Sequence, residues 1–320
     1  MAGSAMPPVR HVSTNGITMG VYEAGAGVPV VFSHGFPELA FSWRHQIKAL
    51  ADNGFHAIAP DQRGFGATDT PPSPDAYHMG ELTADMVGLL DALGLEKAIF
   101  CGHDWGGALV WAMAQFHPDR VAGVIALNTP HFPRTDQNPY ELLRAARGDT
   151  MYMVTFQEPG VAEALLEKDV EATFRATMRR GRYSMDEFMA LPAAVQAIPA
   201  SVFLGDPDVM GEGFLSEDEL AVYVEAYRRN GFRGPLNWYR NFKKNWDLGA
   251  GKSSRIEVPC LMIAAERDFF LPPSMIDGME DWIPDLEKHV IAGSGHWTQQ
   301  EKPEETNRLM LDWLKRRFGT

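Results

Sequence analysis

The chain has 320 residues, of which 45% are hydrophobic and 22% are charged, and its 29 basic and 42 acidic residues give a formal net charge of −13. This composition is typical of a soluble globular enzyme, and the length accommodates one large α/β domain with a sizeable insertion. The acidity argues against nucleic acid or an anionic membrane as a partner. The two cysteines, Cys101 and Cys260, lie in separate apolar segments without CxxC spacing, which predicts buried thiols and no disulfide framework.

No targeting or membrane segment is evident in the sequence. Residues 1–10 lack the apolar stretch of a signal peptide, and no apolar run approaches the roughly 20 residues of a membrane helix. We therefore expect a cytoplasmic protein without membrane contact, either a monomer or a homodimer.

Strand-like and helix-like segments alternate along most of the chain. Short apolar segments bounded by Gly, Pro or Asn predict strands, and spacings of three and four residues between apolar positions predict helices. The expected strands are 17–23, 29–33, 55–59, 98–101, 121–127, 260–265 and 289–291, and the expected helices are 41–50, 82–93, 108–114 and 306–318. This alternation predicts an α/β fold with a mostly parallel central sheet that is covered by helices on both faces.

The segment between residues 131 and 246 has a different pattern. It lacks clean strands and is rich in Met, Phe, Tyr, Arg and Glu at helical spacing, and Ser216 with Glu219 forms a capping box. We predict that 131–246 is a helical cap (lid) domain, inserted between residues 1–130 and 247–320 of the core.

One motif indicates the chemistry. Gly102-His103-Asp104-Trp105-Gly106-Gly107 lies between an apolar strand and a helix, which is the pattern of a nucleophile elbow with aspartate at the nucleophile position. A serine that attacks an alkyl carbon would leave a stable ether. An aspartate leaves an ester, which an activated water can hydrolyse. Asp104 therefore predicts displacement at saturated carbon, such as epoxide opening or halide expulsion.

The other two members of a triad follow downstream in the order nucleophile, acid, histidine. Asp268 comes just after the strand 260–265, and His296 lies in a Gly-rich turn after the last strand. His103 and His131 flank the elbow or the sixth strand but do not fit this order. Asn128 occupies the alternative acid position and cannot stabilise an imidazolium by charge, so Asp268 is the preferred acid.

Two backbone N–H groups are the predicted oxyanion donors. One belongs to Phe36, which follows a strand in His34-Gly35-Phe36-Pro37, and the other to Trp105, directly after the nucleophile. Each donor of this type is typically worth about 2.7–4 kcal/mol of barrier. The helix that begins beside Asp104 also favours its ionised form.

Motifs along nearly the whole chain resemble those of the soluble epoxide hydrolases of the α/β-hydrolase superfamily. In the core they are His34-Gly35-Phe36-Pro37-Glu38, Ser42-Trp43-Arg44, Pro60-Asp61-Gln62-Arg63-Gly64, the elbow and Gly295-His296-Trp297-Thr298-Gln299; in the cap they are residues 156–160 and 231–241. The resemblance implies hydrolysis of an apolar epoxide by water to a vicinal diol, without a cofactor or metal. It also implies a single hydrolase domain without the N-terminal phosphatase domain of mammalian members.

The resemblance further implies that two cap tyrosines, Tyr152 and Tyr239, bind the epoxide oxygen and that one of them donates a proton. A phenol suits this role because its pKa of about 10 keeps it protonated at neutral pH. We also expect an apolar pocket lined by aromatic and thioether side chains near the site. The candidates are Phe36, Trp105, Met153, Phe156, Trp238, Phe269 and Trp297.

Two other functions compete with this prediction. A haloalkane dehalogenase uses the same aspartate and ester, but it typically has a polar residue where this chain has Phe36. A non-catalytic binding protein with a hydrolase fold is disfavoured because every catalytic position is filled. No His, Cys, Asp or Glu cluster has metal-ligand spacing, so we expect no metal site.

Overall fold

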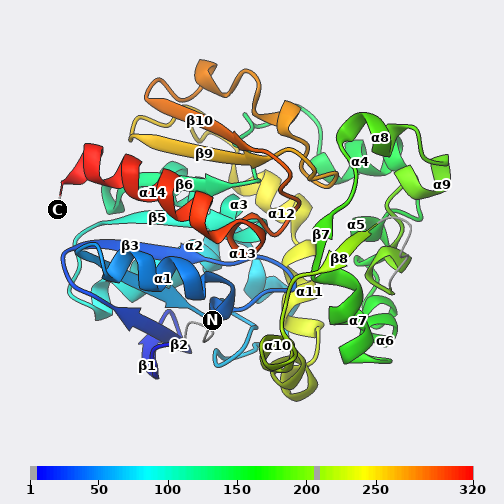
Figure 1. Cartoon of the computed structure of the whole chain (residues 1–320), viewed down its shortest axis with the longest axis horizontal. Coiled ribbons are helices and arrows are strands. Elements are labelled where there is room, and N and C mark those ends of the chain that lie inside the picture. Colours follow the sequence, from blue (N-terminus) through cyan, green and yellow to red (C-terminus); the bar gives the residue numbers. More distant parts are fainter. Residues whose placement is uncertain (1–5, 205–209, 320) are drawn as a thin grey trace.

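A single eight-stranded sheet forms the centre of the computed structural model, which describes residues 6–204 and 210–319 (Figure 1). The strand order is β1-β2-β4-β3-β5-β6-β9-β10. The first three strands in this order pair antiparallel, and every pair from β4 to β10 is parallel. The predicted mostly parallel sheet is confirmed. The strands are Val9–Thr14 (β1), Ile17–Ala24 (β2), Val28–Ser33 (β3), Phe55–Pro60 (β4), Ala98–His103 (β5), Val121–Leu127 (β6), Cys260–Ala265 (β9) and Leu286–Ile291 (β10).

Helices cover both faces of the sheet. α1 and α14 pack together on one face, and α2 and α3 pack together on the other. The apolar stripe predicted for residues 82–93 is the buried side of α2, where Leu82, Met86 and Leu89 contact the core. The core helices are α1 (Arg44–Ala51), α2 (Met79–Ala92), α3 (Trp105–Phe116), α13 (Thr298–Glu301) and α14 (Pro303–Phe318), with 3-10 turns η1 (Ala40–Trp43), η2 (Pro74–Tyr77), η3 (Pro118–Arg120), η5 (Pro273–Ile276) and η6 (Met279–Asp281).

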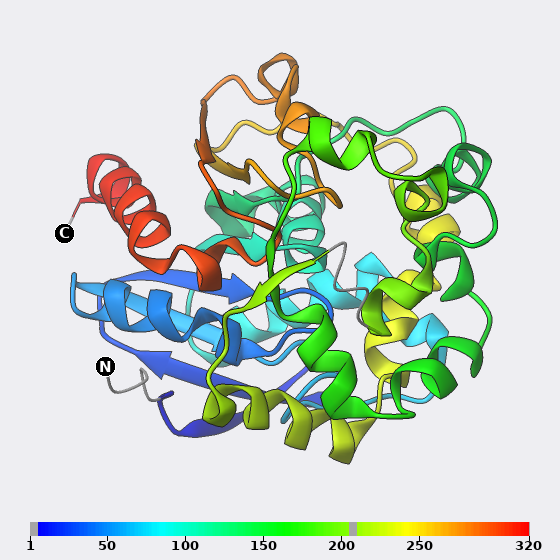
Figure 2. The same cartoon turned by 45° about the vertical axis from the view of Figure 1, so that its right-hand side comes forward.

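The residues between β6 and β9 form an inserted, mainly helical region at one end of the strands (Figures 1 and 2). We call this region the cap; its boundaries at 131 and 246 remain predictions. Its elements are α4 (Pro139–Arg147), α5 (Tyr152–Thr155), α6 (Val161–Leu166), α7 (Val170–Thr177), β7 (Arg179–Gly181), α8 (Met185–Met189), α9 (Ala193–Gln196), η4 (Ala200–Leu204), β8 (Met210–Gly213), α10 (Glu217–Asn230), α11 (Arg233–Tyr239) and α12 (Phe242–Leu248).

Three strands were missing from the sequence prediction. The cap contains an antiparallel pair, β7 and β8, where no strand was expected, because segments of three and four residues rich in Gly and Arg show no alternation. The edge strand β1 was also missed, because four of its six residues are exposed. Cys101 and Cys260 are buried free thiols, as predicted.

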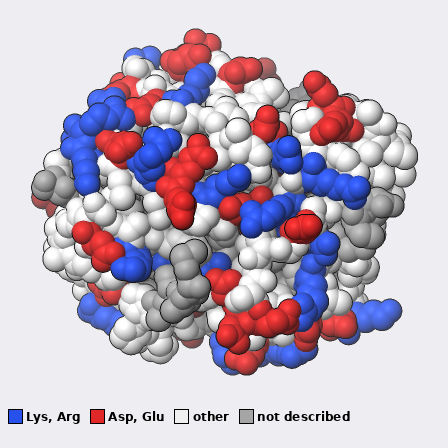
Figure 3. Space-filling view, viewed as in Figure 1, with Lys and Arg blue, Asp and Glu red and all other residues white. Residues whose placement is uncertain are grey.

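Acidic and basic side chains are interspersed on the face shown in Figure 3, so the net negative charge is not concentrated in one patch there. Among the described residues, no helix combines the length and the apolar character needed to cross a bilayer. The expected cellular location and oligomeric state remain predictions.

A buried ion pair within the core involves a residue whose backbone contacts the cap. Arg63 Nε donates to Asp85 Oδ2 at 2.7 Å, and the side chains are 4% and 1% exposed. The carbonyl of Arg63 accepts a hydrogen bond of 3.0 Å from the indole of Trp238 in α11. Loss of either charge would remove the main partner of the other buried charge.

We expect Asp85→Ala to lower the free energy of unfolding by about 3–5 kcal/mol, because it leaves the buried Arg63 guanidinium with only the carboxylate of Glu81, 3.9 Å away, as an ionic partner. Urea unfolding measures this change. Asp91→Ala is the matched control on the same helix, since Asp91 is 64% exposed in its pair with Arg120, and it should cost no more than about 1 kcal/mol. An equal loss of unfolding free energy in the two variants would contradict the stabilising role of the buried Arg63–Asp85 pair.

Candidate active site

Asp104 occupies the sharp turn between β5 and α3. Its φ of 53° and ψ of −122° are unusual for a residue with a side chain. The turn depends on two neighbouring glycines: a Cβ on Gly106 would overlap the carbonyl of Ser33, and one on Gly102 would overlap the carbonyl of Gly106. The structure therefore contains the predicted strand–turn–helix elbow, with the carboxylate projecting beyond the strand end.

Backbone N–H groups surround the Asp104 carboxylate. The N–H of Phe36 donates to Asp104 Oδ1 at 2.8 Å, and the N–H of Trp105 also hydrogen-bonds the carboxylate. Gly35 permits this approach, because a Cβ at that position would overlap the Asp104 side chain. The two predicted oxyanion donors thus converge on one side of Asp104; their role in a tetrahedral intermediate remains a prediction.

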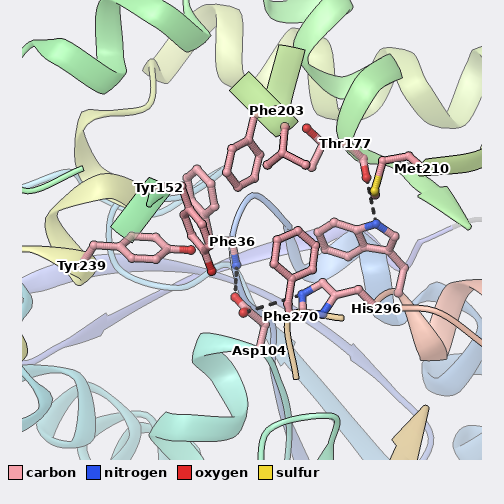
Figure 4. Close-up of a pocket in the computed structure, with 11 residues that line it drawn as sticks. Phe36, Asp104, Tyr152, Thr177, Phe203, Met210, Tyr239, Phe270 and His296 are labelled. Atoms are coloured by element: carbon pink, nitrogen blue, oxygen red, sulfur yellow. Dashed lines mark hydrogen bonds and ion pairs between the residues drawn. The ribbon is translucent and has the colours of Figure 1, made fainter. Parts of the chain in front are cut away.

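His296 lies between two carboxylates. Its Nδ1 donates to Asp268 Oδ2 at 2.8 Å, and its Nε2 is 3.7 Å from Asp104 Oδ2 (Figure 4). Asp268 also accepts hydrogen bonds from the backbone of Phe270 and Leu271 and, at 2.7 Å, from the side-chain amide of Asn128. The structure therefore brings the three predicted triad residues together. Asn128, the rejected alternative, supports Asp268 instead.

Asp104, Asp268 and His296 shift one another's pKa values. Burial raises the pKa of Asp104, although nearby His296 and the backbone donors oppose the rise. Burial also disfavours ionised Asp268, but the contacts with His296 and Asn128 outweigh it and lower its pKa. For His296, burial lowers the pKa, but the charges of Asp268 and Asp104 dominate and raise it to about 9.

Two tyrosine hydroxyls face Asp104 from the cap (Figure 4). Tyr152 begins α5 and Tyr239 ends α11; both are buried, and their ring centres are 6.0 Å apart. The ring of Trp105 packs edge-on against that of Tyr239, with ring centres 5.0 Å apart. Burial, together with the charge of Asp104, raises both phenol pKa values well above their usual range. Both phenols therefore stay protonated at neutral pH.

These groups enclose a small cavity of about 20 Å³, enough for about one or two water molecules. Of the residues that were predicted to line a pocket, Phe36 and Trp297 do so. The cavity is lined by Phe36, Asp104, Tyr152, Thr177, Val202, Phe203, Met210, Tyr239, Phe270, His296 and Trp297. A second, mostly apolar groove of about 400 Å³ between α3 and α12 has Trp105 in its wall.

Five residues that were predicted to line the pocket do not line this cavity, namely Trp105, Met153, Phe156, Trp238 and Phe269. Trp105 faces the groove, and the buried ring of Phe156 packs behind Phe36 and Tyr239. Trp238 packs on Phe65, and Met153 is a partly buried residue at the edge of the core. Phe269 stacks on Phe188 with ring centres 4.8 Å apart.

Sequence reasoning missed several residues of the cavity wall, namely Thr177, Val202, Phe203, Met210 and Phe270. Phe270, with its ring centre 5.1 Å from that of His296, could have been found from its place two residues after Asp268. The other four come from separate cap segments without a recognised motif, so no sequence signal places them here. Among the described residues, no group of three or more His, Cys, Asp or Glu side chains could hold a metal ion.

Comparison with known proteins places this geometry in a family. The α/β-hydrolase fold family model matches residues 28–303. Epoxide hydrolase A of Mycobacterium tuberculosis is 43% identical over 314 residues, which cover 96% of this chain and 97% of that protein. The chain belongs to the epoxide hydrolase family. The crystal structure of epoxide hydrolase A from Mycobacterium thermoresistibile superposes with a TM-score of 0.88 at 40% identity, covering 97% of this chain and 98% of that one.

Other epoxide hydrolases match over only part of their length. Bifunctional epoxide hydrolase 2 of Sus scrofa is 43% identical over 303 residues, which cover 94% of this chain and 54% of that protein. The chain therefore spans about half the length of the mammalian relatives with which it was compared.

In this epoxide hydrolase family member, a buried pair that sequence reasoning did not assign connects three loops of the site. Glu38 accepts hydrogen bonds from the N–H of Gly35 at 2.9 Å, from His103 Nδ1 at 2.7 Å and from Gln299 Nε2 at 2.7 Å. His103 Nε2 is in turn 2.6 Å from the carbonyl of His296. One carboxylate thus fixes the Phe36 loop, the elbow and the His296 loop. The only sequence signal for Glu38 and His103 was that they lie inside the motif 34–38 and the elbow 102–107.

We expect Glu38→Gln to slow epoxide turnover by at least about tenfold and to destabilise the fold by a few kcal/mol, because an amide replaces a buried acceptor of several hydrogen bonds. Steady-state diol formation and urea unfolding measure the two effects. Glu96→Gln removes an exposed carboxylate and should change neither. Unchanged turnover in Glu38→Gln would show that the three loops hold their positions without this charge.

Proposed function

We propose that this protein hydrolyses an epoxide to a vicinal diol through a covalent ester on Asp104. The observation that carries the proposal is the placement of Tyr152 and Tyr239 opposite the Asp104 carboxylate, across a cavity that His296 also lines. An oxirane in this space has a nucleophile behind one ring carbon and two O–H donors at its oxygen. Similarity to proteins named epoxide hydrolases, by both sequence and structure, supports the same activity.

In the first step, Asp104 attacks a ring carbon while the C–O bond on the far side breaks. The developing alkoxide accepts a proton from Tyr152 or Tyr239, leaving a hydroxyalkyl ester on Asp104 and one tyrosinate. The phenols act as acids because an alkoxide is a poor leaving group without a proton donor. Their raised pKa values leave the protonated form available at neutral pH.

Ester formation changes the protonation of His296. In the free enzyme, the Asp104 charge contributes to the raised His296 pKa of about 9, so the imidazole carries a proton at neutral pH. The ester has no charge, so this contribution disappears and the pKa falls. The tyrosinate, a much stronger base, takes the proton and leaves His296 neutral.

In the second step, neutral His296 removes a proton from water, and the resulting hydroxide attacks the ester carbonyl of Asp104. The N–H groups of Phe36 and Trp105 lie where they can stabilise the tetrahedral oxyanion. Collapse expels the diol alkoxide, which takes the proton back from His296. The Asp104 carboxylic acid then returns its remaining proton to His296, which restores the starting state.

The substrate class follows from the cavity wall. Apart from the reacting groups and Thr177, the lining side chains are aromatic, aliphatic or thioether. Such a wall favours an apolar epoxide, since polar substituents would lose water without finding partners. The paired phenols suit an oxygen leaving group, and this favours an epoxide over the haloalkane alternative.

A trapped ester tests the mechanism directly. We expect His296→Gln to form one stoichiometric covalent adduct with styrene oxide, seen as a mass increase on the peptide containing Asp104, with diol formation reduced by about 10²–10⁴-fold. Asp104→Asn provides the control and should form no adduct initially. A His296→Gln protein that makes neither adduct nor diol would exclude the proposed function.

Isotope labelling tests the same ester in the unaltered protein. In a single turnover in water enriched in ¹⁸O, the label should enter the Asp104 carboxylate, because water attacks the ester carbonyl and not the substrate. The diol should acquire label only in later turnovers. Mass spectrometry of both diol and protein measures this. Direct entry of label into the first diol would mean that water opens the ring without an ester.

The pH dependence follows from the His296 charge. Its neutral form is the base, so the rate of ester hydrolysis should rise with pH and then level off. The apparent pKa should lie below the value of about 9 in the free enzyme, because the ester removes the Asp104 charge. Rapid-quench measurement of ester decay between about pH 6 and pH 9 tests this. A rate that falls as the pH rises would contradict the base assignment.

A further inference from the structure

A second buried carboxylate, Glu301 at the end of α13, contacts the backbone on both sides of His296. Glu301 Oε1 accepts a hydrogen bond of 3.0 Å from the N–H of Trp297, and its Oε2 accepts one of 3.0 Å from the N–H of Gly295. The residue is only 5% exposed. The backbone N–H groups of the two residues next to His296 are therefore hydrogen-bonded to one carboxylate.

The same carboxylate reaches the cap. Glu301 Oε2 also accepts a longer hydrogen bond of 3.4 Å from the N–H of Gly181 in β7, and the carbonyl of Glu301 accepts one of 3.2 Å from Arg180 Nη1. Gly181 and Gly295 lie so close that a Cβ on either would overlap the other's backbone. The cap strand β7 thus docks on the His296 loop at Glu301.

Three backbone donors meet on two carboxylate oxygens, an arrangement that an amide cannot reproduce. A carboxylate accepts at both oxygens, whereas glutamine accepts at one and presents N–H donors at the other. In Glu301→Gln, at least one of the N–H groups beside His296 would face another donor. Since the loop is buried there, its backbone must shift to restore a partner.

We propose that Glu301 is a positioning residue for His296, which sets the imidazole for the hydrolytic step and couples its loop to the docked cap strand. This inference rests on the proposed function, in which His296 is the base of the hydrolytic step. Asp104 and the two tyrosines, which form the ester, make no hydrogen bond to Glu301. Loss of the Glu301 carboxylate should therefore slow ester hydrolysis and leave ester formation unchanged.

This separation gives a kinetic signature that simple destabilisation does not. With ester formation as the first irreversible step, kcat/KM reports only the steps up to the ester. Slower hydrolysis makes the ester accumulate, which lowers kcat and KM together. A variant that is only partly folded has fewer active molecules, but its KM is unchanged.

The experiment compares Glu301→Gln with unaltered enzyme on styrene oxide. We expect kcat and KM each to fall about tenfold, part of the 10²–10⁴-fold that a general base supplies, while kcat/KM stays within about twofold. Acid quench should show most of the enzyme as the Asp104 ester at steady state. Glu304→Gln, which removes an exposed carboxylate three residues later, should match the unaltered enzyme.

The other outcomes are also decisive. If kcat falls with KM unchanged, or if no ester accumulates, the positioning role is wrong. If Glu301→Gln does not fold, the same measurements are made on Glu301→Asp, which keeps the carboxylate but shortens the side chain. If neither variant folds, Glu301 is required for folding and the proposal fails. His296→Gln in parallel separates the two claims, because absence of ester there overturns the proposed function itself.

Discussion

The turn at Asp104 places a carboxylate among backbone N–H donors at the end of a buried strand, and the arrangement of the site depends on this turn. It forms because Gly102 and Gly106 allow the strand, the turn and the neighbouring β3 end to approach at backbone contact distance. The N–H of Phe36 can then reach the Asp104 carboxylate at 2.8 Å. A side chain on either glycine would separate the elements that supply the Asp104 carboxylate and its backbone donor.

Four carboxylates surround the site, three of them buried and Asp104 partly exposed, and their hydrogen-bond partners differ. Asp104 faces the cavity and accepts a hydrogen bond from the backbone of Phe36, and it is the one that we propose as the reacting group. Asp268 accepts from His296, Asn128 and backbone, and it therefore holds the imidazole. Glu38 and Glu301 lie behind the site and connect loops. The same chemical group is reactive or structural according to how many of its lone pairs are already satisfied.

Much of the core could be predicted because its signals are local. The strands 121–127 and 260–265 were predicted to the residue, and the elbow and the Gly-rich turn at His296 follow from fixed spacings of glycine and reactive side chains. The cap was harder. Its helices α5, α8 and α9 have only four or five residues each, too short for a periodic pattern, and β7 and β8 show no alternation. Aromatic side chains are abundant there, so their presence does not tell which ones reach the cavity.

The sequence by itself determined the α/β fold and predicted the carboxylate in the elbow and the order of the triad residues, because each is encoded in neighbouring residues and their spacing. Only the tertiary structure decided that Phe270 lines the cavity while Phe269 stacks away from it, since adjacent side chains in a turn point in different directions. The contacts of Glu38 and Glu301 likewise join segments distant in the chain. Such pairings depend on how the sheet and cap pack, which local spacing does not specify.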